Sequence, residues 1–111
     1  MPIRTLLLVL FASPVSARAQ PEPTPDFQVR RGYSVSIASP VLEEARFMAF
    51  DDRGTLFVSQ PGTGRILALR DTDADGVYES ITEFVSGHPT VHGLDWHDGW
   101  LWFTQSGSIH R

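Results

Sequence analysis

Hydrophobic and polar residues alternate along much of the chain after residue 26, and a period of two is typical of β-strands. The alternating segments are short, and turns rich in Asp and Gly separate them. We therefore expect strands in RFMAF, TLFVS, RILALR and VYESITEFV, between residues 46 and 85. FQVRRGYSVSIAS (27–39) predicts a further half-buried strand, and VLEEARF (41–47) predicts a single helical turn.

The closing stretch of the chain repeats an earlier one. HGLDWHDGWLWFTQSGSIHR (92–111) aligns with RFMAFDDRGTLFVSQPGTGRILALR (46–70) when two short gaps are allowed. The alignment pairs Phe50 with Trp96, Gly54 with Gly99, Leu56 with Leu101, Gln60 with Gln105 and Ile66 with Ile109. Short strands that repeat with a period of about 45 residues are the signature of a β-propeller blade.

The repeat predicts an all-β fold of the β-propeller type. A first blade is expected over residues 27–90 and an incomplete second blade over 91–111, which makes about one and a half blades. A propeller needs about four blades or more to close. We therefore expect this sequence to be the N-terminal fragment of a longer protein.

Charge and composition limit which partners, cross-links and cellular locations are expected. The 111 residues carry a net charge of −4, no Cys and no run of basic residues among aromatics. Disulfides, thiolate metal sites and nucleic-acid partners are therefore not expected. Residues 1–19 combine an early Arg, a short apolar run and an Ala-Arg-Ala site, which together predict a cleaved secretory signal peptide. The apolar run is shorter than the roughly 20 residues of a membrane span, and the Pro-rich residues 20–26 form an expected linker.

Two segments make the sequence similar to a known family. ARFMAFDDRGTLFV (45–58) and the acidic loop DTDADG (71–76) resemble the N-terminal blades of pyrroloquinoline-quinone-dependent sugar dehydrogenases, in particular the sorbosone and pyranose dehydrogenase branch. The resemblance extends over about residues 27–111. It implies a secreted or periplasmic six-bladed propeller that holds the quinone (PQQ) and Ca²⁺ at the mouth of its channel. Such an enzyme oxidises a sugar or a sugar aldehyde and passes electrons to an external acceptor.

Arg46 and His92 are the candidate site residues at that mouth. Each lies four positions before a paired aromatic, Phe50 or Trp96, and so just ahead of the innermost strand of its blade. Arg suits an anionic quinone because its planar guanidinium pairs with carboxylates at two points. We assign Arg46 to cofactor binding and His92 to catalysis as the base that takes a proton from the sugar. The alternative is that His92 only lines the cavity.

The acidic loop is the candidate metal site. Asp71, Asp73 and Asp75 with Gly76 match the start of an EF-hand calcium loop, and Glu79 stands at its ninth position. The twelfth position is Thr82, so the bidentate Glu of an EF-hand is missing. A polar hairpin turn with no metal is the alternative. Blade topology puts this loop at the end opposite the channel mouth.

The other histidines and the tryptophans have ordinary explanations. His88, His97 and His110 are read as solvated loop or strand-edge residues rather than zinc ligands. Trp96, Trp100 and Trp102 are read as packing between blades rather than a platform for sugars. Outside the quinoprotein family, a non-catalytic exported propeller that binds a ligand or a protein partner remains the alternative function.

Overall fold

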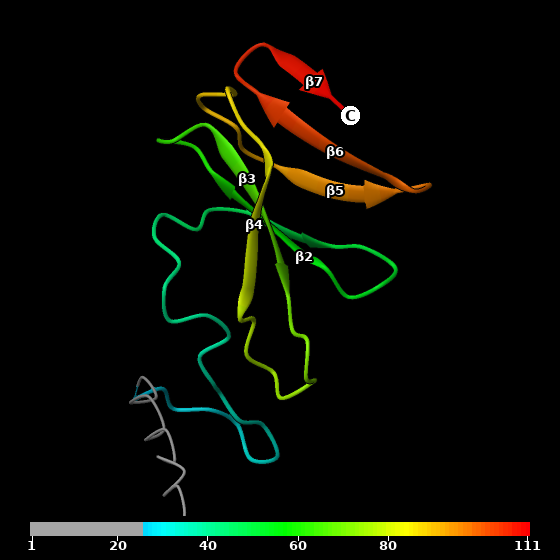
Figure 1. Cartoon of the computed structure of the whole chain (residues 1–111). Coiled ribbons are helices and arrows are strands. Elements are labelled where there is room, and N and C mark those ends of the chain that lie inside the picture. The colour runs from blue at the N-terminus through cyan, green and yellow to red at the C-terminus, as the bar shows by residue number, and fades with distance from the viewer. Residues whose placement is uncertain (1–25) are drawn as a thin grey trace, which may run out of the picture.

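Figure 1 presents the computed structural model of the chain, which describes residues 26–111. The expected signal peptide (1–19) and all but the last residue of the expected linker (20–26) lie outside the described residues. Seven strands and no helix occur in the described part of the chain. None of these residues forms a helix that is long and apolar enough to cross a membrane.

The strands form two antiparallel sheets. The first sheet has the order β1-β2-β3-β4 and the second has the order β5-β6-β7. Their bounds are β1 (Met48–Phe50), β2 (Leu56–Gln60), β3 (Arg65–Arg70), β4 (Ser80–Val85), β5 (Leu94–His97), β6 (Trp100–Gln105) and β7 (Ser108–His110). The all-β prediction is confirmed, and every strand predicted between residues 46 and 85 has its counterpart in the first sheet.

Two predictions about the segment before β1 are wrong. Residues 27–39 form no strand, although their apolar positions alternate, and Tyr33 is 72% exposed. A strand needs a neighbour with which to exchange hydrogen bonds, and no edge of either sheet takes this segment as a partner. Residues 41–47 form no helical turn, because Glu44 adopts a left-handed φ of 58°.

Tight turns and one close crossing hold the sheets in place. Asp98 and Gly99, with φ of 50° and 77°, form the two-residue hairpin turn between β5 and β6. Gly64 precedes β3, and a Cβ there would lie 2.7 Å from the backbone nitrogen of Pro89. Glycine at this position lets residues 86–91 cross close to the β2–β3 loop and lead the chain into the second sheet.

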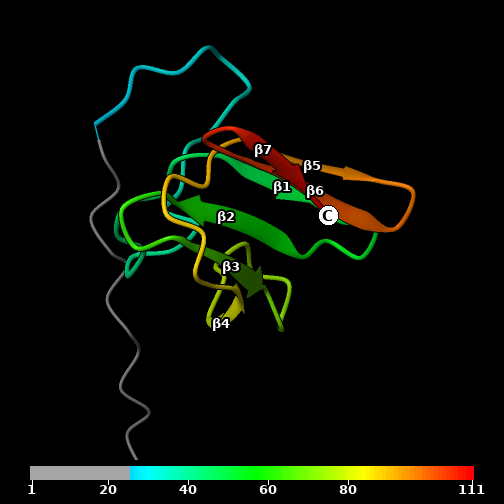
Figure 2. The ribbon, with the colours of Figure 1, turned by 90° about the horizontal axis from the view of Figure 1, so that it is seen from above.

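The two sheets pack face to face. Figure 1 shows β5–β7 apart from β2–β4, and Figure 2 shows β5–β7 over β1 when seen from above. The core between them contains Phe57, Ile66, Ala68, Val91, Leu101 and Phe103, all buried. The other side of the first sheet carries a second cluster of Leu56, Val58, Leu67 and Leu69, which Leu42, Tyr78 and Ile81 cover in part. Both sides of β2 and β3 are therefore buried.

The structure supports the sequence repeat at the level of the backbone. Phe50 pairs with Leu56 across β1 and β2, just as Trp96 pairs with Leu101 across β5 and β6. Ser59 pairs with Ile66, and Thr104 pairs in the same way with Ile109. The strand pairings thus reproduce the alignment read from the sequence.

The repeat also fixes which side of each sheet meets the other. We call the side of Phe57, Ile66 and Ala68 the forward face of the first sheet, and the side of Leu56, Val58, Leu67 and Leu69 its rear face. In the second sheet, Leu101 and Phe103 are the equivalents of Leu56 and Val58 and belong to the rear face. The forward face of the first sheet therefore packs on the rear face of the second, a head-to-tail arrangement.

Candidate functional site

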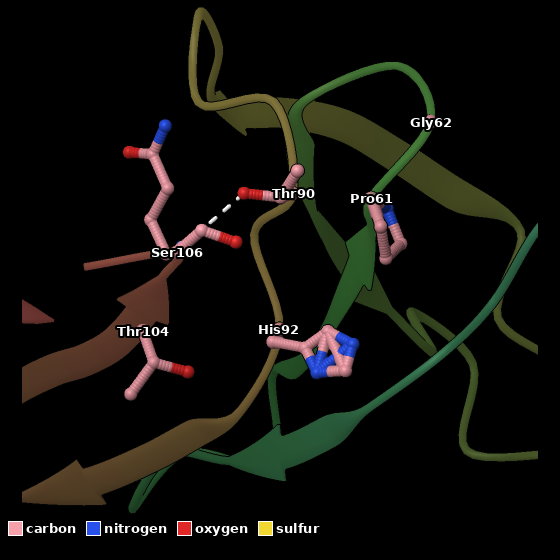
Figure 3. A pocket seen from close by; sticks show the side chains of 7 residues that line it. Pro61, Gly62, Thr90, His92, Thr104 and Ser106 are labelled. Atoms are coloured by element: carbon pink, nitrogen blue, oxygen red, sulfur yellow. Dashed lines mark hydrogen bonds between the residues drawn. The ribbon is translucent and has the colours of Figure 1, made fainter. Parts of the chain in front are cut away.

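A pocket with mostly polar lining residues lies at the end of the sheets where β2 leads into β3 and β6 into β7. It has a volume of about 640 Å³, and its lining residues are Pro61, Gly62, Thr90, His92, Thr104, Gln105 and Ser106. Figure 3 shows His92 and Pro61 on one side and Thr104 and Ser106 on the other. The Ser106 N–H donates to Oγ1 of Thr90 at 3.2 Å, which ties the two loops together.

The main chain of His92 is held on both sides. Its N–H donates to the carbonyl of Thr104 at 2.8 Å, and its own carbonyl accepts from Oγ of Ser59 at 2.8 Å. The imidazole contacts the ring of Phe47 with centroids 5.2 Å apart. A fixed backbone and an exposed ring give an imidazole that can exchange protons with a molecule in the pocket.

Arg46 occupies the equivalent backbone position in the first sheet. Its N–H donates to the carbonyl of Ser59 at 3.0 Å, as that of His92 does to Thr104. Its guanidinium lies 5.7 Å from the centroid of the Phe47 ring. Phe47 thus contacts both predicted site residues, which lie at the same end of the two sheets. Arg46 itself is not among the residues that line the pocket.

At the opposite end, the structure brings together three of the four predicted metal ligands. Carboxylate oxygens of Asp71, Asp73 and Glu79 all lie within 4.8 Å of one another. The carboxylate of Asp75 instead accepts the N–H of Val77 at 2.8 Å. Oxygen atoms are the ligands that Ca²⁺ prefers, so the trio has suitable donors.

Two carboxyl groups of the acidic loop have pKa values shifted in opposite directions, lower for Asp71 and higher for Asp73. The N–H of Gly76, which donates to Asp71 at 2.8 Å, is the main reason why the pKa of Asp71 is lowered. The N–H of Asp75 would lower the pKa of Asp73 as well, but desolvation and the charges of Asp75, Glu79 and Asp71 together raise it. The negative charges around Asp73 repel one another, and a bound cation would reduce this repulsion.

The turn between β1 and β2 lies at the same end of the sheet as the acidic loop. A pocket of about 400 Å³ there has residues from both, namely Asp51, Arg53, Gly54, Thr55, Arg70 and Asp71. The Asp51 carboxylate accepts the N–H groups of Arg53 and Thr55 at 2.9 and 2.7 Å. Burial raises the pKa of Asp51, but these hydrogen bonds outweigh it and lower the value overall. The pocket of His92 and the acidic loop are thus at different ends of the sheets.

The sequence did not predict that the rings of His88, Phe103 and His110 form a cluster. The His88 ring meets Phe103 edge-on at 5.1 Å and His110 at 4.9 Å, and its Nδ1 lies 3.0 Å from Oε1 of Gln105. His88 lies in the loop between the sheets and His110 in the edge strand β7, as expected, but both are half-buried because their rings pack against Phe103. No spacing in the sequence signals this cluster, because His88 lies in the crossover between the sheets. His97 is exposed beside Asp98, as expected.

The tryptophans divide between the two faces of the second sheet. Trp96 stacks on Phe57 of the first sheet at 5.9 Å and 9°, which supports its reading as packing between sheets. Trp100 is 51% exposed, and the Arg111 guanidinium lies 4.9 Å from its ring and 5.4 Å from that of Trp102. Within the described residues, no second sheet covers these two rings.

Comparison with known proteins adds no relative: no protein-family model, curated protein or solved structure matches the chain.

Proposed function

We propose that the chain is the N-terminal part of an exported β-propeller quinoprotein that oxidises a sugar or a sugar aldehyde with PQQ. The observation that carries the proposal is the equivalent backbone position of Arg46 and His92 at one end of two stacked sheets, where His92 lines a pocket. The resemblance of the sequence to the sugar dehydrogenases supplies the chemistry. The four-stranded first sheet and the repeat in the second support the reading as successive blades.

Arg46 is suited to hold the anionic quinone. Its side chain is exposed, and within residues 26–111 no carboxylate lies within ion-pair distance of it. The guanidinium is therefore free to donate two parallel hydrogen bonds to a carboxylate of the cofactor. When bound, PQQ would accept the two electrons that the sugar carbon gives up.

His92 is suited to handle the proton in the same reaction. A neutral imidazole can accept a proton from a sugar hydroxyl. Thr90, Thr104 and Gln105 line the same pocket and offer hydroxyl and amide groups that can bind and orient a sugar.

The acidic loop is proposed as a separate calcium site with a structural role. Asp71, Asp73 and Glu79 would supply its oxygens. Because the loop lies at the end opposite the pocket of His92, this ion would not contact the quinone. It would reduce the repulsion among the carboxylates and hold β3 and β4 together where the chain turns.

The test uses a protein in which the propeller is complete, loaded with PQQ and Ca²⁺. Arg46→Ala should weaken PQQ binding about tenfold or more, since charge-assisted hydrogen bonds contribute about 1.5–3 kcal/mol. Arg53→Ala is the matched control at the opposite end and should leave PQQ binding unchanged. His92→Gln should lower turnover with PQQ still bound. Unchanged PQQ affinity in Arg46→Ala, or unchanged turnover in His92→Gln, would remove that residue from the site.

Export is tested separately, by sequencing the N-terminus of the protein recovered outside the cytoplasm. Cleavage after the Ala-Arg-Ala site predicts a start near Gln20. A start at Met1 in exported material would contradict the signal peptide.

One observation favours the alternative of an exported propeller that binds a ligand without catalysis. Among the described residues that line the pocket, His92 is the only ionisable one, and the other six are neutral. Such a lining suits a neutral polar molecule such as a sugar. Sugar binding by the complete protein, with no turnover after PQQ and Ca²⁺ are added, would support this alternative over the dehydrogenase.

A further inference from the structure

We infer that Thr90 is a positioning residue that holds His92 in place beside the pocket. The inference deepens the proposed function, because it rests on His92 as the group that accepts the proton of the sugar. Thr90 lies two residues before His92, and both line the pocket. Figure 3 shows the two on one segment of the chain. Thr90 combines an unfavourable backbone conformation with hydrogen bonds to both loops that line the pocket.

The backbone of Thr90 adopts a conformation that its side chain disfavours. The N–H of Val91 donates to the carbonyl of His88 at 3.0 Å, which closes a four-residue turn with Pro89 second and Thr90 third. The φ of Thr90 is 67°. A proline in second place and a positive φ in third are typical of a type II turn, in which Gly or Asn normally takes the third position. For a β-branched residue such a φ is an outlier, and it indicates a role for the side chain that glycine cannot fill.

The contacts of Thr90 identify that role. Its Oγ1 accepts the N–H of Ser106 at 3.2 Å, in the loop between β6 and β7. Its own N–H donates to the carbonyl of Pro61 at 3.1 Å, in the loop between β2 and β3. Both loops contribute lining residues to the pocket. Thr90 therefore joins the two loops through one side-chain and one backbone hydrogen bond.

Val91 connects this fixed point to His92. Val91 is fully buried in the core between the sheets. The N–H of His92 donates to the carbonyl of Thr104 at 2.8 Å, so the chain is held at three consecutive residues. The imidazole of His92 is itself exposed and contacts the ring of Phe47, with centroids 5.2 Å apart. A change at Thr90 should therefore move the imidazole relative to Phe47.

The first sheet repeats the unfavourable conformation at the equivalent position. Glu44 lies two residues before Arg46, as Thr90 does before His92, and its φ is 58°. Among the non-glycine residues of the described chain, only four have a positive φ, and these equivalent positions are two of them. The Glu44 carboxylate lies against Gly62, where a Cβ would clash with it, and so it too reaches the loop after the second strand of its own sheet. The recurrence supports a common positioning role.

The first test measures the position of the His92 ring and does not depend on catalysis. An aromatic ring shifts the NMR signals of nearby protons, so the ring protons of His92 in the full chain report how close Phe47 is. Phe47→Leu gives the reference without this shift. Thr90→Gly fits the turn without strain but lacks the hydroxyl, and Thr90→Val lacks the hydroxyl but stays β-branched.

Both Thr90→Gly and Thr90→Val should lose the shift at His92, whereas Thr90→Ser should retain it because the hydroxyl is kept. Thr90→Gly and Thr90→Ser decide the result if Thr90→Val does not fold. Thr63→Val is the matched control. It removes a hydroxyl whose hydrogen bonds to Gln60 and Arg65 stay beside the β2–β3 loop, and it should leave the shift unchanged.

The second test measures turnover in the complete protein with PQQ and Ca²⁺. A misplacement of about 1 Å at a reacting group can cost about 100-fold in rate, so Thr90→Gly should lower kcat at least about tenfold with little change in KM. Thr90→Ser should recover most of the loss. His92→Gln is measured alongside. If it lowers kcat and Thr90→Gly does not, the inference fails and the proposed function stands. If His92→Gln leaves kcat unchanged, the proposed base fails, and the NMR shift alone decides the role of Thr90.

Three results would overturn the inference. A shift retained in Thr90→Gly or Thr90→Val would show that the hydroxyl does not hold His92. A shift lost in Thr90→Ser as well would assign the effect to the methyl group of Thr90. A higher KM with unchanged kcat in Thr90→Gly would make Thr90 a group that binds the sugar directly.

Discussion

Ser59 offers the sharpest test of how the two sheets hold together. It is fully buried, and its hydroxyl connects the N–H of Phe47 in the first sheet with the carbonyl of His92 before the second. Ser59→Ala removes the hydroxyl and leaves both backbone groups without this partner. A buried group that loses its hydrogen bond costs about 1–3 kcal/mol. For a domain of 60–100 residues, each 1 kcal/mol corresponds to a shift of about 4–8 °C in Tm.

The assay is urea unfolding followed in two ways. Fluorescence reports the second sheet, because Trp96, Trp100 and Trp102 all lie there, and far-UV circular dichroism reports both sheets. Ser59→Ala should lower the free energy of unfolding by about 1–3 kcal/mol, with the fluorescence transition at or below the urea concentration of the dichroism transition. The second sheet should separate first, because the lost bond joins it to the first sheet.

Thr104→Ala is the matched control for this prediction. It removes the equivalent hydroxyl, which makes its local bond to Gly93 but no bond between sheets. Its cost should be below about 1 kcal/mol, since the site is exposed. An equal loss in both variants, or a loss of less than about 0.5 kcal/mol in Ser59→Ala, would refute the reasoning that this hydroxyl joins the sheets.

Three further predictions follow from the acidic residues and the open edge. The pKa of Asp51 in the folded protein is lowered from its ordinary value of 3.8. Its contribution to stability is therefore present above that pH and is lost as the pH falls through the folded pKa. Asp51→Ala should destabilise the protein by about 1 kcal/mol at pH 7 and by much less near pH 2, and an equal loss at both would contradict this. Terbium luminescence should reveal a cation site in the acidic loop with a dissociation constant of about 10⁻⁴–10⁻³ M. Asp73→Asn should weaken that site more than Asp75→Asn, and the reverse order would favour the EF-hand arrangement over the observed trio. The β7 edge is unpaired, so sedimentation should show association that rises with concentration, whereas a compact monomer with one cooperative thermal transition would show that the two sheets are self-sufficient.

The sequence determined the strands from β1 to β7 and their repeat, because both depend on local order. Alternation and Asp/Gly turns located the strands from β1 to β4, and the repeat located those from β5 to β7. The alignment matched Ile66 with Ile109, and the structure gives both the same partner position, Ser59 in the first sheet and Thr104 in the second. The equivalent positions of Arg46 and His92 follow for the same reason.

Tertiary structure decided the features that depend on contacts between residues far apart in the sequence. Residues 27–39 alternate like a strand, but no sheet edge pairs with them, and so they remain irregular. Asp75 has the spacing of a metal ligand, but its carboxylate lies outside the trio of Asp71, Asp73 and Glu79 that the fold brings within 4.8 Å. The bond from Ser59 to His92 joins positions 33 residues apart, and His88 meets Phe103 only because the crossover passes that sheet. A local pattern predicts which residues can form a strand or a ligand set, whereas packing between sheets decides which partner each group meets.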